Sequence, residues 1–363
     1  MEPQTHRRAA LRRALQASDL DALLVTDLLN IRYLTGFTGS NAALLVAAGG
    51  EQGSVFCTDG RYGTQAQRQV PDLRLVVDRP CDLVLAAAAA EAGCRRLGFE
   101  SHRVTVDGHA AVAATAPGVE LVRAPGMVEA LRVVKDDTEV EALRMACAAA
   151  DRALADLIAH GGLRPGRTER EVARELADRM LDHGAAGPSF ESIVATGANS
   201  AVPHHRPTDA VLAGGDLVKL DFGALVDGYH SDMTRTVVLG EPAAWQREIY
   251  QLVAAAQASG RAALWPDADV RDVDAAAREV IQRAGYGDQF VHGLGHGVGL
   301  AIHEAPTLSR LGDGKLTAGM AVTVEPGVYL AGRGGVRIED TLVVRDGEPE
   351  LLTLTTKELV VVS

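Results

Sequence analysis

The sequence predicts an α/β domain followed by an α+β domain that contains an internal duplication. In the amino-terminal part, short apolar runs alternate with helical patterns, which is typical of an α/β domain. In the remainder, a pair of long helical patterns leads into a β-rich region, and this order occurs twice. A charged stretch opens the first long helix, so we divide the chain into residues 1–125 and 126–363.

Local periodicity predicts the elements of the amino-terminal domain in order. Arg, Ala and Leu recur at helical spacing over 6–18, which indicates an amphipathic helix. Short apolar runs bounded by polar residues then predict strands. These runs lie at 22–25, 42–46, 54–57 and 73–77.

The carboxyl-terminal domain is predicted from longer helical patterns. Two helices are expected at 137–160 and 168–184, and a second pair at 243–264 and 269–285. Each pair precedes a region of short apolar, strand-like runs. The repeated order of two helices and a sheet predicts two halves related by a pseudo-two-fold axis.

Composition restricts the classes of function. The chain has 363 residues and a formal net charge of −12, and a surface of that sign repels nucleic acid and anionic membranes. No apolar run approaches the ~20 residues of a transmembrane helix, and the Arg-rich start lacks the apolar stretch of a signal peptide. The four cysteines form no CxxC pair. We therefore expect a cytoplasmic protein with neither nucleic-acid nor membrane partners.

The first segment with candidate chemistry is a hairpin around Asp227-Gly228, a strong turn signal. A two-residue loop at this dipeptide would place Asp221 opposite Thr234, with Asp232 on the same face of the sheet. Aspartate is depleted in strands, and two carboxylates on one face repel each other unless a cation lies between them. The hairpin therefore predicts half of a cation site.

The second segment places His292, His296 and His303 among four glycines, which let the backbone approach a ligand closely. Two common motifs are excluded. Thr307 stands where a zincin HExxH motif has its second histidine, and Val298 replaces the third glycine of GxGxxG. The segment is therefore a candidate site without a known short motif.

The third segment adds Glu325 and Glu339, each within strand-like apolar surroundings where a charged group needs a partner. With Asp221, Asp232 and one histidine they form a cluster of four carboxylates and an imidazole. Such carboxylates would raise one another's pKa values unless divalent cations balanced them. This set of ligands favours two ions of manganese, cobalt, iron or zinc over copper or an iron–sulfur centre.

The sequences LDFGALVDGYHSDMTRT, HGLGHGVGLAIHE, VEPGVY and VRIED resemble those of the pita-bread metallopeptidases, family M24. Within that family the chain is similar to the Xaa-Pro peptidases, namely proline dipeptidase (prolidase) and aminopeptidase P. The stretches NIRYLTGFTGSN and TDGRY resemble their creatinase/prolidase-like amino-terminal domain, so the similarity spans nearly the whole chain. It implies a pita-bread catalytic domain with internal duplication.

The resemblance also implies a role for each candidate ligand. Asp221 would bind one metal through both oxygens, and Asp232 and Glu339 would bridge the two metals. His296 and Glu325 would complete the second site. Glu325 would in addition accept a proton from the attacking water. The expected cofactors are two divalent ions per chain, Mn²⁺ first, with Co²⁺, Zn²⁺ or Fe²⁺ as alternatives.

Further residues are assigned to catalysis and substrate binding in the same way. His204, His292 and His303 match family histidines that contact the substrate. His205 departs from the family pattern, in which a glycine often follows the first histidine, and this difference could alter substrate fit. A dipeptidase also needs a cation for the free carboxylate of proline, and Arg310 and Arg337 are the candidates.

The implied reaction is hydrolysis of the Xaa-Pro bond in short proline-containing peptides. The proline nitrogen carries no N–H, so peptidases that need that donor fail and a dedicated enzyme is required. We favour the dipeptidase over the aminopeptidase. Family relatives are commonly dimers or tetramers, so we expect a homo-oligomer, with a dimer as the first choice.

Three other members of the same fold class were considered. Creatinase lacks the metal-binding set, whereas all five ligand positions here carry competent side chains. Methionine aminopeptidase shares the ligands but has no counterpart of residues 1–125. Metal-free binding modules, such as histone chaperone subunits, remain a distant alternative that the intact ligands disfavour.

Overall fold

The computed structural model describes residues 3–362. The chain divides into two compact units between Arg132 and Val133, a few residues beyond the position expected from the sequence. Helix α6 (Met127–Arg132) therefore belongs to the first unit. Within the described residues no helix is long and apolar enough to cross a membrane.

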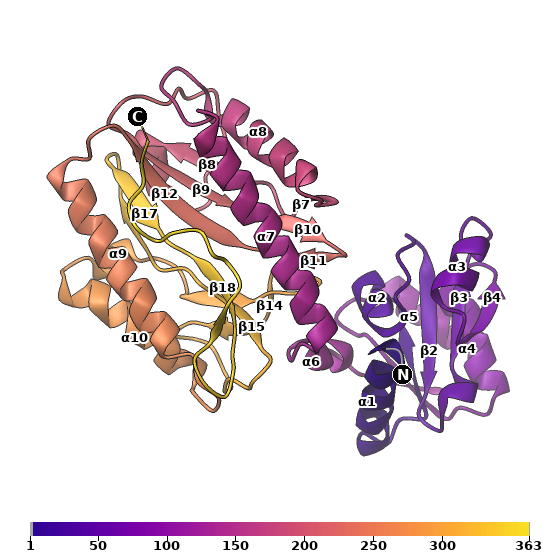
Figure 1. The fold of residues 1–363 in the computed structure, drawn as a ribbon. Coiled ribbons are helices and arrows are strands. Elements are labelled where there is room, and N and C mark those ends of the chain that lie inside the picture. Colours follow the sequence, from indigo (N-terminus) through magenta and orange to yellow (C-terminus); the bar gives the residue numbers. More distant parts are fainter. Residues whose placement is uncertain (1–2, 363) are drawn as a thin grey trace. The chain divides into compact units, whose positions relative to one another are not determined.

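The first unit is built on a six-stranded mixed sheet in the order β4-β3-β2-β1-β5-β6 (Figure 1). Helix α4 packs on β1, β2 and β3. The strands are β1 (Ala22–Val25), β2 (Ala42–Ala47), β3 (Val55–Thr58), β4 (Arg74–Val77), β5 (Arg96–Phe99) and β6 (Glu120–Arg123). The other helices are α1 (Pro3–Ala17), α2 (Leu28–Thr35), α3 (Gly63–Gln69), α4 (Cys81–Glu91), α5 (Val106–Thr115) and the 3-10 turn η1 (Glu51–Gly53). This is the α/β domain predicted from the alternation of apolar runs and helical patterns.

The second unit begins with two helices whose starts are encoded locally. Asp136 and Thr168 each form a capping box with a glutamate three residues later, which satisfies the free N–H groups of the first turn. The helices are α7 (Asp137–Ala159) and α8 (Glu169–Asp182). They lead to the sheet β20-β12-β9-β8 and the small sheet β11-β10-β7. These strands are β7 (Gly187–Pro188), β8 (Ile193–Thr196), β9 (Leu217–Phe222), β10 (Ala224–Val226), β11 (Tyr229–His230), β12 (Met233–Leu239) and β20 (Val361–Val362), with the 3-10 turn η2 (Gly197–Ala201) after β8.

A second helix pair and sheet repeat this order. Helices α9 (Ala244–Ala262) and α10 (Val270–Arg283) precede the sheet β14-β13-β15-β18-β19 and the hairpin β16-β17. These strands are β13 (Gly295–Gly297), β14 (Glu304–Leu308), β15 (Ala321–Val324), β16 (Gly327–Leu330), β17 (Gly334–Arg337), β18 (Asp340–Val343) and β19 (Glu350–Leu351), with the 3-10 turn η3 (Gly287–Gln289) before β13. Each half has its own apolar cluster. The strands lie between the two helix pairs (Figure 1), so the predicted internal duplication is confirmed.

The hairpin that carries both aspartates has the predicted register. Val226 pairs with Tyr229 across the turn, and farther along Asp221 pairs with Thr234. Asp227 and Gly228 have φ values of 48° and 77°, the left-handed conformations that a two-residue hairpin loop of this type requires. The aspartates are therefore placed by local turn chemistry.

Gly223 makes the break between β9 and β10 possible. A Cβ atom at this position would lie 1.7 Å from the carbonyl oxygen of Ser231, which is far inside van der Waals contact. Because the obstacle is backbone, it cannot move aside without shifting the segment between β11 and β12 that contains Asp232. The close approach of the two strands therefore depends on glycine.

We predict that Gly223→Ala lowers the free energy of unfolding by at least ~2 kcal/mol, since overpacking against backbone is not relieved by a rotamer change. Chemical denaturation of the purified variants measures this loss. Gly187→Ala in the neighbouring strand β7 is the matched control, because its Cβ would meet no atom within 4 Å. Equal stability of the two variants would contradict the steric argument.

Candidate metal centre

The five predicted ligands lie at or beside strands of the second unit. Asp221 lies in β9 and Asp232 directly precedes β12, whereas His296 lies in β13. Glu325 directly follows β15, and Glu339 lies between β17 and β18. The first two residues come from one half of the duplicated unit and the other three from the second half. The centre is therefore assembled where the two halves meet.

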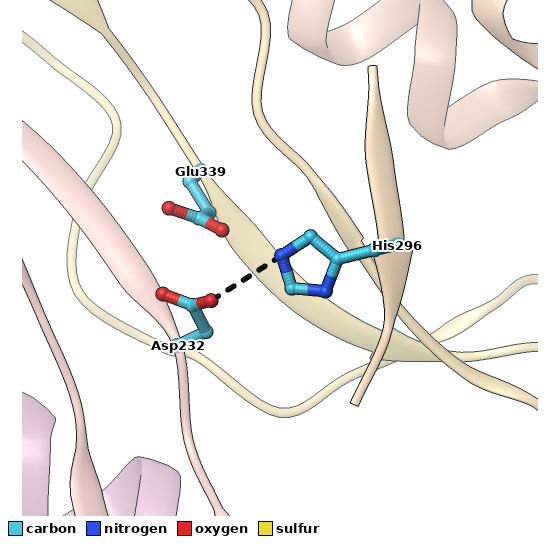
Figure 2. Close-up of side chains that lie close together, drawn as sticks. All are labelled: Asp232, His296 and Glu339. Carbon is cyan, nitrogen blue, oxygen red and sulfur yellow. Dashed lines mark ion pairs between the residues drawn. The ribbon is translucent and has the colours of Figure 1, made fainter. Parts of the chain in front are cut away.

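The side chains of Asp232, His296 and Glu339 point toward one another (Figure 2). One potential ligand atom from each lies within 4.8 Å of the others. His296 Nε2 is 3.6 Å from Asp232 Oδ2 and 3.4 Å from Glu325 Oε1. The fifth residue, Asp221, acts electrostatically on the other three carboxyl groups. Burial is the largest cause of their raised pKa values, and the negative charge of Asp221 raises these values further.

Two carboxylate oxygens in this cluster lack a partner. Among the described residues, Asp221 Oδ1 and Glu339 Oε1 are buried and accept no hydrogen bond. Glu339 is 1% exposed, so water cannot replace the missing partner at its surface. A buried carboxylate oxygen without a donor is costly, and a cation ligated by it removes that cost.

Burial and mutual repulsion shift the acidities of the cluster in one direction. Burial raises the pKa of Glu325 to about 7, and the charge of Asp221 adds to this against the opposing effect of Arg337. Burial, followed by the neighbouring carboxylates, raises the pKa values of Asp232 and Glu339 well above their usual range. Divalent cations would favour the ionised carboxylates and reverse these shifts. The residues present therefore fit a metal centre.

Two threonines orient the ligands. Thr234 Oγ1 donates to Glu339 Oε2 at 2.6 Å, and Thr323 Oγ1 donates to Glu325 Oε1 at 3.2 Å while accepting from the His296 amide. His296 Nδ1 lies 3.0 Å from the carbonyl oxygen of Gly297, so this nitrogen carries the proton and leaves the Nε2 lone pair facing the carboxylates. Burial also lowers the pKa of His296, which keeps the ring neutral as a ligand must be.

The three catalytic histidines expected from the sequence lie around this cluster. The exposed His303 ring meets the His296 ring edge to face, with centroids 4.4 Å apart. Burial lowers the pKa of His292 to about 3, and the charge of Arg337 contributes next. His204 is exposed and adds a smaller decrease to the pKa values of both His292 and His303, after burial and nearer charges. The structure thus brings all three histidines together.

His292 is held by Tyr329, which the sequence analysis did not single out. His292 Nδ1 lies 2.8 Å from the carbonyl oxygen of Gly293, and its Nε2 lies 2.9 Å from the Tyr329 hydroxyl. Since a carbonyl only accepts, Nδ1 carries the proton and Nε2 accepts from the tyrosine. Tyr329 stands four residues after Glu325 in VEPGVY, so its place in that motif was the available signal.

Arg337 does not have the role of a substrate anchor that the sequence suggested. Its side chain is buried, and its Nη2 forms an ion pair with Asp221 Oδ2. The other nitrogens donate to Thr234 Oγ1 at 3.0 Å, the Tyr329 hydroxyl at 2.7 Å and the Pro203 carbonyl at 3.2 Å. A guanidinium enclosed by four protein acceptors orders a ligand rather than receiving a peptide carboxylate. We therefore correct this assignment.

The other two substrate-binding candidates lie elsewhere. His205 Nε2 is 2.8 Å from Glu169 Oε2, so its ring faces a fully buried carboxylate of α8. This contact replaces the substrate-facing role considered from the sequence with a structural one. Arg310 is exposed in the loop after β14.

Lys219 is a buried lysine beside the centre, and nothing in the sequence indicated its place there. Lys219 is 0% exposed and stands two residues before Asp221, so both side chains emerge on the same face of β9. Its Nζ donates to the carbonyl oxygens of Val202 and Pro203, at 2.6 and 3.1 Å. Burial lowers the pKa of Lys219 to about 6, and the charge of Arg337 contributes.

Comparisons with known proteins identify the family. Residues 141–346 match Metallopeptidase family M24, and residues 7–134 match the Creatinase/Prolidase N-terminal domain. The chain is 42% identical over 240 residues to a Xaa-Pro dipeptidase of Pyrococcus furiosus, covering 66% of this chain and 68% of that protein.

Solved structures agree over the full length. A Xaa-Pro dipeptidase from Bacillus anthracis superposes with a TM-score of 0.94 at 39% identity, covering 99% of both chains. An X-Pro aminopeptidase from Thermotoga maritima gives a TM-score of 0.89 at 32% identity, covering 98% of this chain and 99% of that one. The chain is an enzyme, a metallopeptidase, and it belongs to metallopeptidase family M24 with an amino-terminal domain of the creatinase/prolidase type.

Proposed function

We propose that this metallopeptidase is a Xaa-Pro dipeptidase that uses two divalent ions. The observation that carries the proposal is the buried cluster of four carboxylates and one imidazole, in which Asp221 Oδ1 and Glu339 Oε1 lack partners among the described residues. Asp221, Asp232, His296, Glu325 and Glu339 would hold the two ions. Manganese is our first choice among manganese, cobalt, zinc and iron, because the donors are mostly oxygens.

The ions would supply a water of lowered pKa beside the scissile carbonyl and would polarise that carbonyl. The chain supplies the remaining chemistry. Glu325 would accept a proton from the attacking water at a carboxylate oxygen and pass it to the leaving proline nitrogen. His303 and His204, the exposed members of the histidine set, would donate hydrogen bonds to the oxyanion. The buried, neutral His292 would contact the substrate from its fixed position beside Tyr329.

The dipeptidase assignment rests on the names of the similar proteins, since those of Pyrococcus furiosus and Bacillus anthracis are Xaa-Pro dipeptidases. The Thermotoga maritima aminopeptidase is similar over nearly the same length, so release of the first residue from longer Xaa-Pro peptides is the second candidate. Both reactions use the same centre. They differ in whether the site accepts residues beyond proline.

The cellular location and the oligomeric state of the enzyme are also proposed. We propose a cytoplasmic homodimer, on the grounds of its few cysteines without a CxxC pair, which suit a reducing compartment, and of the resemblance to oligomeric relatives. Its partners would be short proline-containing peptides.

Asp232→Asn should reduce kcat/KM for Ala-Pro by at least ~100-fold and lower the bound metal, because a bridging carboxylate contacts both ions. Steady-state kinetics and metal analysis measure the two effects. Asp227→Asn is the matched control, since asparagine suits the left-handed φ of 48° at that turn. Near-normal turnover of the Asp232 variant would contradict the two-metal proposal.

His303→Ala should keep the metal content and reduce kcat by ~10²-fold, as expected for removal of an oxyanion donor. The comparison is with His160→Ala, an exposed histidine at the end of α7 that is remote in sequence from every ligand. Unchanged hydrolysis by the His303 variant would remove this residue from the catalytic set.

The substrate class is tested with two peptides. After reconstitution with manganese, cobalt, zinc or iron, the enzyme should hydrolyse Ala-Pro and leave Ala-Pro-Ala intact. Product analysis by chromatography distinguishes the outcomes. Cleavage of the tripeptide after alanine would favour the aminopeptidase, and cleavage of neither peptide would reject both candidates.

A further inference from the structure

The segment that carries His204 connects η2 to β9 and contains little regular structure. Within the described residues, no hydrogen bond or ion pair is found for the His204 side chain, which is exposed. Its position is therefore set by the backbone on either side of it. The neighbouring residues Pro203 and His205 are both hydrogen-bonded to buried polar side chains, those of Lys219 and Glu169.

On one side, Lys219 holds the segment through two consecutive carbonyl groups. Its Nζ lies 2.6 Å from the Val202 oxygen and 3.1 Å from the Pro203 oxygen, and above the Tyr329 ring at 5.1 Å. Arg337 adds a bond to the Pro203 oxygen at 3.2 Å. Hydrogen bonds from one buried amine to two adjacent peptide groups fix both the place and the orientation of the backbone that enters His204.

On the other side, the carboxylate of Glu169 at the start of α8 binds residues that lie before and after His204 in the chain. It is 0% exposed, and its Oε1 accepts from Thr196 N and Asn199 Nδ2, both at 2.9 Å. Its Oε2 accepts from Thr208 N at 2.9 Å and Thr208 Oγ1 at 2.7 Å, and lies 2.8 Å from His205 Nε2. One carboxylate therefore closes the segment into a loop around His204.

We propose that Lys219 and Glu169 are positioning residues that fix His204 over the metal centre from opposite ends of its loop. The catalytic part of this inference rests on the proposed function, in which His204 donates to the oxyanion. The positional part does not, because it concerns only where the His204 ring is held. The Lys219 side chain is fully buried and its amine needs hydrogen-bond acceptors, which the two carbonyls of this loop provide.

A double-mutant cycle separates positioning from a general structural role. Lys219→Met removes the hydrogen-bonding amino group while keeping the length of the side chain, and it should lower kcat/KM for Ala-Pro ~10- to 100-fold through misplacement of a catalytic group. In a His204→Ala background the same substitution should have little further effect. In a His303→Ala background, the matched control, it should retain its full effect. Multiplicative losses with His204→Ala would overturn the proposal.

A second readout does not depend on activity. In protein labelled at the histidine rings, NMR should show a shifted or multiplied His204 signal in Lys219→Met, with the His303 signal unchanged. Glu169→Gln, which keeps the shape but removes the charge, should produce the same selective change and covers the case in which the lysine variant fails to fold. A His204 signal identical to that of the wild type in the folded variants would reject the inference. If the wild type hydrolyses no Xaa-Pro peptide while the signal responds as expected, only the proposed function fails.

Discussion

The second unit depends on holding four carboxylates close together in its interior. Unpaired, they repel one another, and this repulsion adds to the effect of burial, which is the main cause of the raised pKa values of Asp232, Glu325 and Glu339. The protein does not surround them with enough donors, since Asp221 Oδ1 and Glu339 Oε1 remain without partners in the described part of the chain. Added positive charge stabilises the ionised form of such a cluster, and divalent cations supply it compactly.

The fold meets this constraint by taking ligands from both halves of a duplicated unit. Strands fix each carboxylate by register, and buried ion pairs fix the loops that surround them. Arg278 pairs with Asp274 and donates to the His292 carbonyl at 2.7 Å. Lys135 pairs with Glu304, the neighbour of His303, at 2.9 Å. The segments that carry His292 and His303 are thus each tied to a buried charged group beside the centre.

Features set by local chemistry were predictable from the sequence, whereas long-range partners were not. The turn at Asp227-Gly228 fixed the pairing of Asp221 with Thr234, because a two-residue loop determines register. Arg337 is an example of a residue whose partner could not be predicted from the sequence. An arginine two residues before Glu339 suggested a free cation, and its true partner, Asp221, lies 116 residues away in the sequence. His205 shows the same limit, since its contact with Glu169 spans 36 residues.

Arg337 also connects Asp221, a proposed metal ligand, with His292 and the loop of His204, which are proposed to contact the substrate. Its pairing with Asp221 Oδ2 leaves Oδ1 as the oxygen free to face a cation. The same guanidinium donates to the Tyr329 hydroxyl, which in turn donates to His292. Through Pro203 it also reaches the loop of His204. One buried cation therefore contacts a proposed metal ligand and, through Tyr329 and Pro203, the surroundings of two histidines, so a shift at any of these contacts would be felt at the others.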